Sequence, residues 1–79
     1  MVDSQEYKAI QGQIYGLIRE SDSSIHPPEL LARLRREGIP REVASTIMWE
    51  MIASGYISRS KDWLLAPERE PTHELEMYA

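Results

Sequence analysis

The sequence predicts a mainly α-helical domain that ends in a small antiparallel β-hairpin. Three segments have the apolar spacing of amphipathic helices, at residues 5–20, 27–37 and 41–54. Gly38 and Gly55 follow the second and third segments directly, and glycine is the residue that most often ends a helix. Two short runs at 56–59 and 63–66 are rich in aromatic and aliphatic residues and enclose a polar turn, which is typical of a hairpin.

The composition limits the chain to one small domain. At 79 residues it buries only about 60–65% of its unfolded surface, which leaves one modest core. It has no cysteine, so disulfides and cysteine-based zinc sites are excluded. No apolar run approaches the roughly 20 residues of a membrane helix, and the first residues, MVDSQEYK, lack the pattern of a signal peptide. We therefore expect a cytoplasmic protein.

The acidic charge lies at the two ends of the chain. The net charge is −4, which argues against a generic nucleic-acid binder. However, residues 1–23 contribute −2 and residues 68–79 contribute −3, whereas residues 24–67 carry +1. We predict that residues 1–67 form the domain and that residues 68–79 are an acidic, flexible tail.

The first helix has one apolar face and one strip of small residues. Asp3 and Glu6 have the spacing of a capping box. The apolar face consists of Tyr7, Ile10, Ile14, Leu17 and Ile18. The opposite strip, Ala9, Gly12 and Gly16, includes two glycines that each cost the helix about 1 kcal/mol relative to alanine. Such a strip admits a second copy of the helix or the chain's own tail; alternatively, the glycines are simply tolerated on an exposed face.

The second helix follows a polar break and two prolines. Ile25 is expected to form a very short strand, and His26 to cap the helix. Pro27 and Pro28 suit a first helical turn, where a missing N–H costs nothing. The residues expected to face the core are Leu30, Leu31 and Leu34.

Pro40 stands where the third helix should begin. The buried stripe of this helix is predicted to be Val43, Ala44, Ile47, Met48, Met51 and Ile52. Its outward positions are Arg41, Glu42, Ser45, Thr46, Trp49, Glu50 and Ala53.

Residues 5–66 resemble the winged helix-turn-helix superfamily, in particular its small bacterial, archaeal and phage regulators. The resemblance is carried by Pro28-Glu29-Leu30-Leu31, by Gly38-Ile39-Pro40, by Val43, Ile47 and Met51, and by Gly55-Tyr56-Ile57. It implies three helices plus a wing, with the helix at 41–54 presented to the major groove of double-stranded DNA. It also implies a role in transcription regulation.

The resemblance implies candidate DNA-binding residues in three places. Base edges would be approached by Arg41, Glu42, Ser45 and Thr46, one backbone strand by Arg33 and Arg36, and another by Arg59 and Lys61 on the wing. Alternatively, these arginines are solvated surface groups. Two of them stand four residues after an acid, as Glu29–Arg33 and Glu37–Arg41.

Two features of the third helix weaken the prediction of DNA binding. Glu42 and Glu50 are both expected to point outward, where they would repel phosphate. Trp49 is a large aromatic residue on the same face, as at many protein interaction sites; alternatively, it folds over the core edge or onto the wing. A protein-interaction adaptor built on Trp49 is therefore a second hypothesis. Tyr56 and Trp63 are expected to cover the sheet, with stacking on unpaired bases as the alternative.

Nothing in the sequence predicts an enzyme. It contains no glycine-rich phosphate loop and no nucleophile motif. His26 and His73 are the only histidines and have no helical partner for a metal, so we expect no metal and no cofactor. The expected partners are double-stranded DNA, a second copy of the chain in a homodimer, or another protein.

Overall fold

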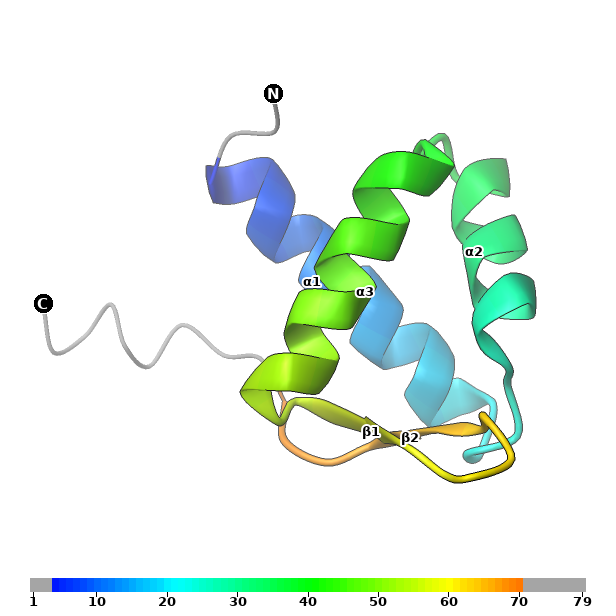
Figure 1. Ribbon diagram of the computed structural model, residues 1–79. Helices are drawn as coiled ribbons and strands as arrows, with labels where there is room; N and C mark the ends of the chain where they lie inside the picture. Colours follow the sequence, from blue (N-terminus) through cyan, green and yellow to red (C-terminus); the bar gives the residue numbers. More distant parts are fainter. Residues whose placement is uncertain (1–3, 71–79) are drawn as a thin grey trace, which may run out of the picture.

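Three helices and a two-stranded antiparallel hairpin follow one another along residues 4–70, the part of the chain that the computed structural model describes (Figure 1). The elements are α1 (Ser4–Glu20), α2 (Pro27–Arg36), α3 (Arg41–Ser54), β1 (Ile57–Arg59) and β2 (Leu65–Pro67). This order is the layout of a winged helix, and it confirms the predicted fold class. Asp3, the proposed cap of the first helix, lies outside the described residues.

The short connection between α2 and α3 is closed by the predicted glycine. Gly38 has φ +92°, the left-handed conformation that side chains disfavour. It donates to the Arg35 carbonyl at 3.0 Å, and the next residue, Ile39, donates to the Leu34 carbonyl at 3.0 Å. These two bonds form a Schellman motif, and Ile39 is buried beside the helix end. The motif turns the chain sharply, so α3 starts against α2.

The end of α3 is built in the same way. Gly55 has φ +84° and donates to the Ile52 carbonyl at 3.2 Å, while Tyr56 donates to the Met51 carbonyl at 3.0 Å. This confirms Gly55 as the predicted stop and directs the chain straight into β1.

Both strands of the wing differ from their predicted bounds: β1 begins at Ile57 instead of Tyr56, and β2 spans Leu65–Pro67 instead of 63–66. Ile57 pairs with Pro67, Ser58 with Ala66 and Arg59 with Leu65. The predicted second strand at 63–66 is therefore shifted, and Trp63 lies in the turn instead of the strand. Its N–H donates to the Ser60 carbonyl at 2.9 Å, which closes the turn before the strand begins.

Ile25 adds a one-residue bridge at the other edge of β2. The Leu65 N–H donates to the Ile25 carbonyl at 2.9 Å, and the two residues form an isolated antiparallel bridge. This confirms the very short strand predicted before α2. His26, at the start of that helix, makes no capping bond, contrary to prediction; its Nδ1 lies 3.1 Å from the Trp63 carbonyl oxygen. The ring therefore ties the start of α2 to the wing turn.

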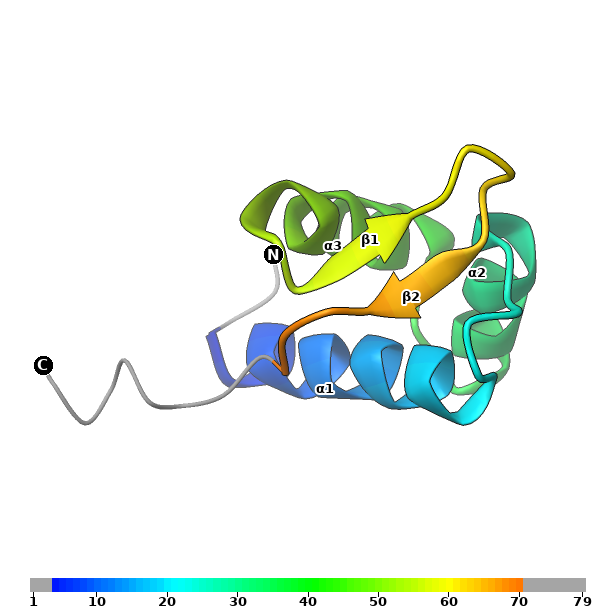
Figure 2. The same cartoon turned by 90° about the horizontal axis from the view of Figure 1, so that it is seen from below.

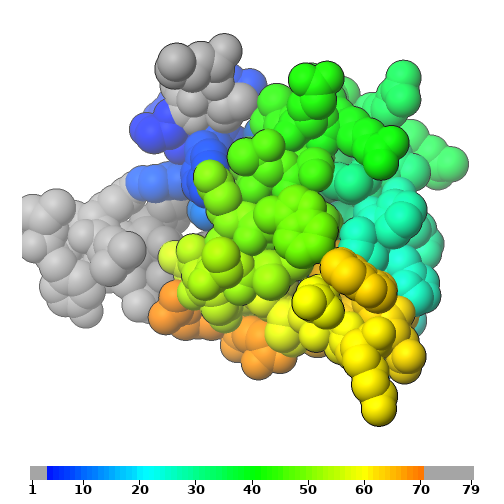
Figure 3. Space-filling view, viewed as in Figure 1, coloured from blue at the N-terminus to red at the C-terminus, as the bar shows by residue number. Residues whose placement is uncertain are grey.

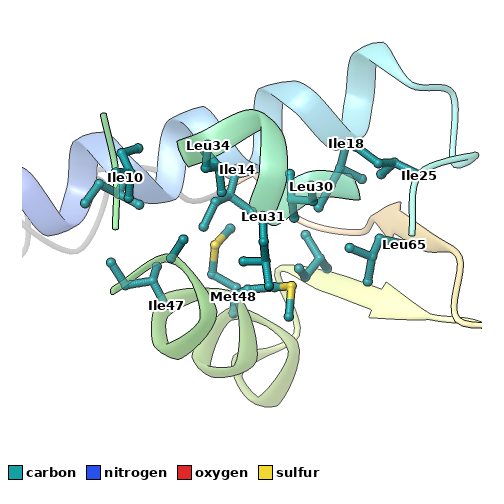
Figure 4. Packing of buried hydrophobic residues seen from close by; sticks show 14 residues of the cluster. Ile10, Ile14, Ile18, Ile25, Leu30, Leu31, Leu34, Ile47, Met48 and Leu65 are labelled. Carbon is teal, nitrogen blue, oxygen red and sulfur yellow. The ribbon is translucent and has the colours of Figure 1, made fainter. Parts of the chain in front are cut away.

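The core is entirely apolar within residues 4–70. All three helices, the α2–α3 turn, Ile25 and both strands contribute to it, and its members pack in one cluster (Figure 4). The buried residues are Ile10, Ile14, Ile18, Ile25, Leu30, Leu31, Leu34, Ile39, Ala44, Ile47, Met48, Met51, Ile57 and Leu65. Val43 and Ile52, predicted in the buried stripe of α3, are only partly buried. No polar side chain is buried in the described region.

Figure 2 shows how the elements are layered. α1 runs along one side, α3 lies on the other, and the hairpin closes the gap between them at one edge, with α2 at the far end.

Hydrogen bonds continue past the predicted domain boundary at residue 67: the N–H groups of Glu68 and Arg69 both donate to the Tyr56 carbonyl at 2.9 Å. Among residues 4–70, no helix is long and apolar enough to cross a membrane.

Candidate nucleic-acid interface

The outward face of α3 and the wing lie on one side of the molecule. Figure 3 views this side: α3 crosses its centre, the wing lies below and to the right, and α2 flanks it on the right. Glu42, Thr46 and Trp49 are exposed on α3, and Ser45 is half-buried on its flank. The Thr46 hydroxyl donates to the Glu42 carbonyl at 2.9 Å, so its proton is used within the helix. The structure thus places the four predicted base-contacting residues on or beside one exposed helix face.

Three arginines gather in a groove where α2 meets the start of α3. Arg35 and Arg36 come from α2 and Arg41 from α3, and they line a depression of about 450 Å³. The other lining residues are Pro28, Leu31 and Ala32. Within residues 4–70 none of the three guanidinium groups has an ion pair or a hydrogen bond from its side chain. Guanidinium groups that converge without a carboxylate form a surface suited to anions.

Arg35 is a site residue that the sequence interpretation missed. It follows Leu31 by four residues, so the two side chains lie one above the other on the same flank of α2. That flank faces the start of α3, because Leu31 and Arg41 line the same groove. The spacing to Leu31 was the signal that could have identified Arg35.

Arg33 lies apart from this groove. Its guanidinium pairs with Glu29, one turn earlier, at 3.2 Å, and both side chains are about half exposed, at 45% and 52%. Such a surface pair contributes little to stability. The second proposed pair, Glu37–Arg41, is not among the ion pairs of residues 4–70, so Arg41 is available to the groove.

An aromatic pair joins α3 to the wing. The Trp49 and Trp63 rings meet edge to face, with centroids 5.8 Å apart and an interplanar angle of 83°. This confirms that Trp49 packs against the wing, although 44% of Trp49 and 43% of Trp63 remain exposed. The Arg59 guanidinium carbon lies 4.3 Å from the centroid of the Trp63 ring, within the range of a cation–π contact. Lys61 is exposed on the same turn.

Trp63 holds an unfavourable backbone conformation. Its φ is +64°, in the left-handed region that costs a non-glycine residue about 1–2 kcal/mol. The placement of Trp63 in the second strand was wrong, because this conformation turns the chain before β2 begins at Leu65. Tyr56, predicted to cover the sheet, is half-buried against the core, with the Arg69 guanidinium 4.8 Å from its ring centroid.

Glu50 is exposed, as predicted for an outward position of α3. It accepts a hydrogen bond from the Tyr7 hydroxyl of α1, so it lies on the flank of α3 that faces α1. Burial of the phenol, together with this bond to the carboxylate, raises the pKa of Tyr7 to about 12. Both acids expected to repel phosphate are therefore exposed, and Glu50 is the one bonded to α1.

The small-residue strip on α1 is open. Ala9 and Gly12 are exposed and Gly16 is partly buried. A Cβ atom added to either glycine would meet nothing within 4 Å. No neighbour within residues 4–70 therefore requires these glycines, and the use of this strip by a second copy stays a prediction.

Comparison of the chain with protein-family models, with curated proteins and with solved structures gives no match. The functional interpretation therefore depends on the residues and geometry of the chain itself.

Proposed function

We propose that this protein binds double-stranded DNA as a small winged-helix transcription regulator, with α3 in the major groove. The observation that carries the proposal is the groove in which Arg35, Arg36 and Arg41 converge without a carboxylate partner among residues 4–70. Phosphate oxygens are the anions that arginine binds best in two-point contacts. The groove adjoins the start of the helix that the superfamily resemblance assigns to DNA, so the two lines of argument favour the same face.

The wing supports the same proposal from the other side. Arg59 ends β1, and Lys61 lies on the turn that follows it. This turn packs against the middle of α3 through Trp63 and Trp49. A helix flanked by cations on both sides matches a major groove, which has a phosphate backbone along each edge. The bond between Glu50 and Tyr7 strengthens this view, because it draws one acidic group to the α1 side.

The overall charge of −4 does not prevent this function. Residues 4–70 carry nine basic and ten acidic side chains, so the folded part is nearly neutral and its cations are locally concentrated. We expect weak binding by one copy and stronger binding by a homodimer, because a second copy doubles the number of phosphate contacts.

The test is a titration of backbone amide shifts with duplex DNA at low and moderate salt. We expect shifts on residues 41–50 and 58–62 that diminish as salt rises. Arg35→Ala and Arg41→Ala should each weaken binding and reduce the slope of log affinity against log salt by about 0.9. Arg33→Ala is the matched control, since Arg33 already pairs with Glu29 outside the groove. A duplex that perturbs no amide at low salt would refute the proposal.

A second candidate function, a protein-interaction adaptor, is favoured by the exposed Trp49–Trp63 pair. Two adjacent half-exposed tryptophans are unusual on a surface and common in protein contacts. If duplex DNA perturbs no amide on the α3–wing face, the adaptor hypothesis is favoured. Salt-sensitive amide shifts on that face would exclude an adaptor role as the main function.

A further inference from the structure

The Arg59 guanidinium is already ordered by its contact with Trp63. Its central carbon lies over the Trp63 ring, 4.3 Å from the ring centroid. Stacking leaves the N–H groups in the guanidinium plane free to donate. Within residues 4–70 Arg59 makes no side-chain hydrogen bond and no ion pair. Its N–H groups are therefore not used by any hydrogen bond or ion pair among the described residues, while the ring contact restricts the side chain.

The presence of tryptophan at position 63 calls for an explanation. At φ +64° a glycine or an asparagine would sit with less strain than a bulky aromatic residue. Trp63 is 43% exposed, so burial of the rest of the side chain offsets the strain, but a large part of the indole stays at the surface. The turn itself is held by backbone groups: the Trp63 N–H donates to Ser60, and its carbonyl lies 3.1 Å from the His26 ring nitrogen. The backbone bonds of the turn do not involve the indole, whose contacts are with Trp49 and with the Arg59 guanidinium.

The same indole links the wing to α3. Trp49 projects from the exposed face of that helix and meets Trp63 edge to face at 5.8 Å. The Arg59 guanidinium thus has a set position relative to the helix proposed to enter the groove. Ordering a side chain before binding removes part of the entropy cost of binding.

We propose that Trp63 is a positioning residue that holds the Arg59 guanidinium ready for a phosphodiester oxygen of duplex DNA, and that Trp49 fixes this group relative to α3. The inference rests on the proposed DNA-binding function. It distinguishes Arg59 from Lys61, a cation on the turn after β1 that has no aromatic ring against it within the described residues.

The decisive experiment is a double-mutant cycle on duplex affinity at low salt. Arg59→Ala and Trp63→Asn should each weaken binding, Trp63→Asn by about two- to fivefold, the size of an exposed cation–π contact. Once Arg59 is gone, Trp63→Asn should cause no further loss, since the two residues act as one unit. Trp63→Asn should also flatten the dependence of log affinity on log salt, although it removes no charge. A purely structural tryptophan would leave that slope unchanged.

Control variants show which affinity results support the inference and which overturn it. Trp63→Phe should retain most of the affinity because it keeps a ring under Arg59. Combining Trp63→Asn with Lys61→Ala should give additive losses. Losses that add for Arg59 and Trp63 would overturn the inference while leaving DNA binding intact. A parent chain that binds no duplex would refute the proposed function, and the inference with it.

A last variant tests the inference even if Trp63→Asn fails to fold. Arg59→Lys keeps the charge but loses the planar stack, so its affinity should fall towards that of Arg59→Ala. If circular dichroism shows that Trp63→Asn is unfolded, this variant decides: an Arg59→Lys chain as tight as the parent overturns the inference.

Discussion

At the residue scale, the Tyr7–Glu50 contact is the clearest case of a titratable group shaped by packing. The phenol has a pKa of about 12 in the folded chain against 10.0 for the unperturbed group. The unfolded chain therefore loses this proton first as pH rises. The stabilisation is fully present below pH 10 and is lost between pH 10 and about 12.

We expect Tyr7→Phe to remove this alkaline decline. The free energy of unfolding is measured in urea from pH 8 to pH 11.5. Above pH 10 it should fall more steeply with pH in the parent chain than in the variant. Tyr15→Phe is the control, because Tyr15 lies on the same helix without a hydrogen bond within residues 4–70. An equal decline in the parent and in Tyr7→Phe would contradict the assignment.

At the element scale, the glycines separate into two kinds. Gly55 ends α3 at φ +84°, whereas Gly12 lies in the middle of α1 with open space where a Cβ would be. The same substitution should therefore have opposite effects. Gly55→Ala should lower the free energy of unfolding by about 1 kcal/mol or more, and Gly12→Ala should raise it by up to about 1 kcal/mol. Thermal and urea unfolding of both variants measure the difference.

A destabilising Gly12→Ala would show that the strip on α1 is covered in solution. Unfolding at several protein concentrations then shows whether a second copy contacts the strip, because such a contact makes stability depend on concentration. If such a dimer exists, Gly12→Leu should convert it to a monomer in a sedimentation experiment.

The elements were predictable from sequence because their ends are decided locally. Gly38 and Gly55 each close a Schellman motif within a few residues, so their effect is visible in the chain itself. Trp63 was misplaced because its residue type favours a strand and the turn overrides that preference. The bond of Glu50 to Tyr7 and the place of Arg35 in the groove could not be predicted, for a different reason. Each of the two residues lies on a helix flank whose neighbour, α1 or α3, is known only once the helices are packed.

At the scale of the whole molecule, one small apolar core supports every surface feature. A chain of this length has a total stability of roughly 4–12 kcal/mol. Leu34 is fully buried between the helices, so Leu34→Ala should cost about 2–5 kcal/mol, a large share of that total. Leu17→Ala, at a partly buried position on α1, should cost less. Chemical denaturation compares the two, and equal losses would mean that Leu34 has no special place in the core.

The two ends of the described chain lie on the same side of the molecule, away from α2 and from the tip of the wing (Figures 1 and 2). Ser4 begins α1 there, and the residues after β2 return there, where the Arg69 guanidinium donates to the Ser54 carbonyl at 3.2 Å. A fluorophore attached at Ser4 or at Arg69 would therefore lie away from α2 and from the tip of the wing. The molecule can be immobilised by one side while the other is offered to a duplex.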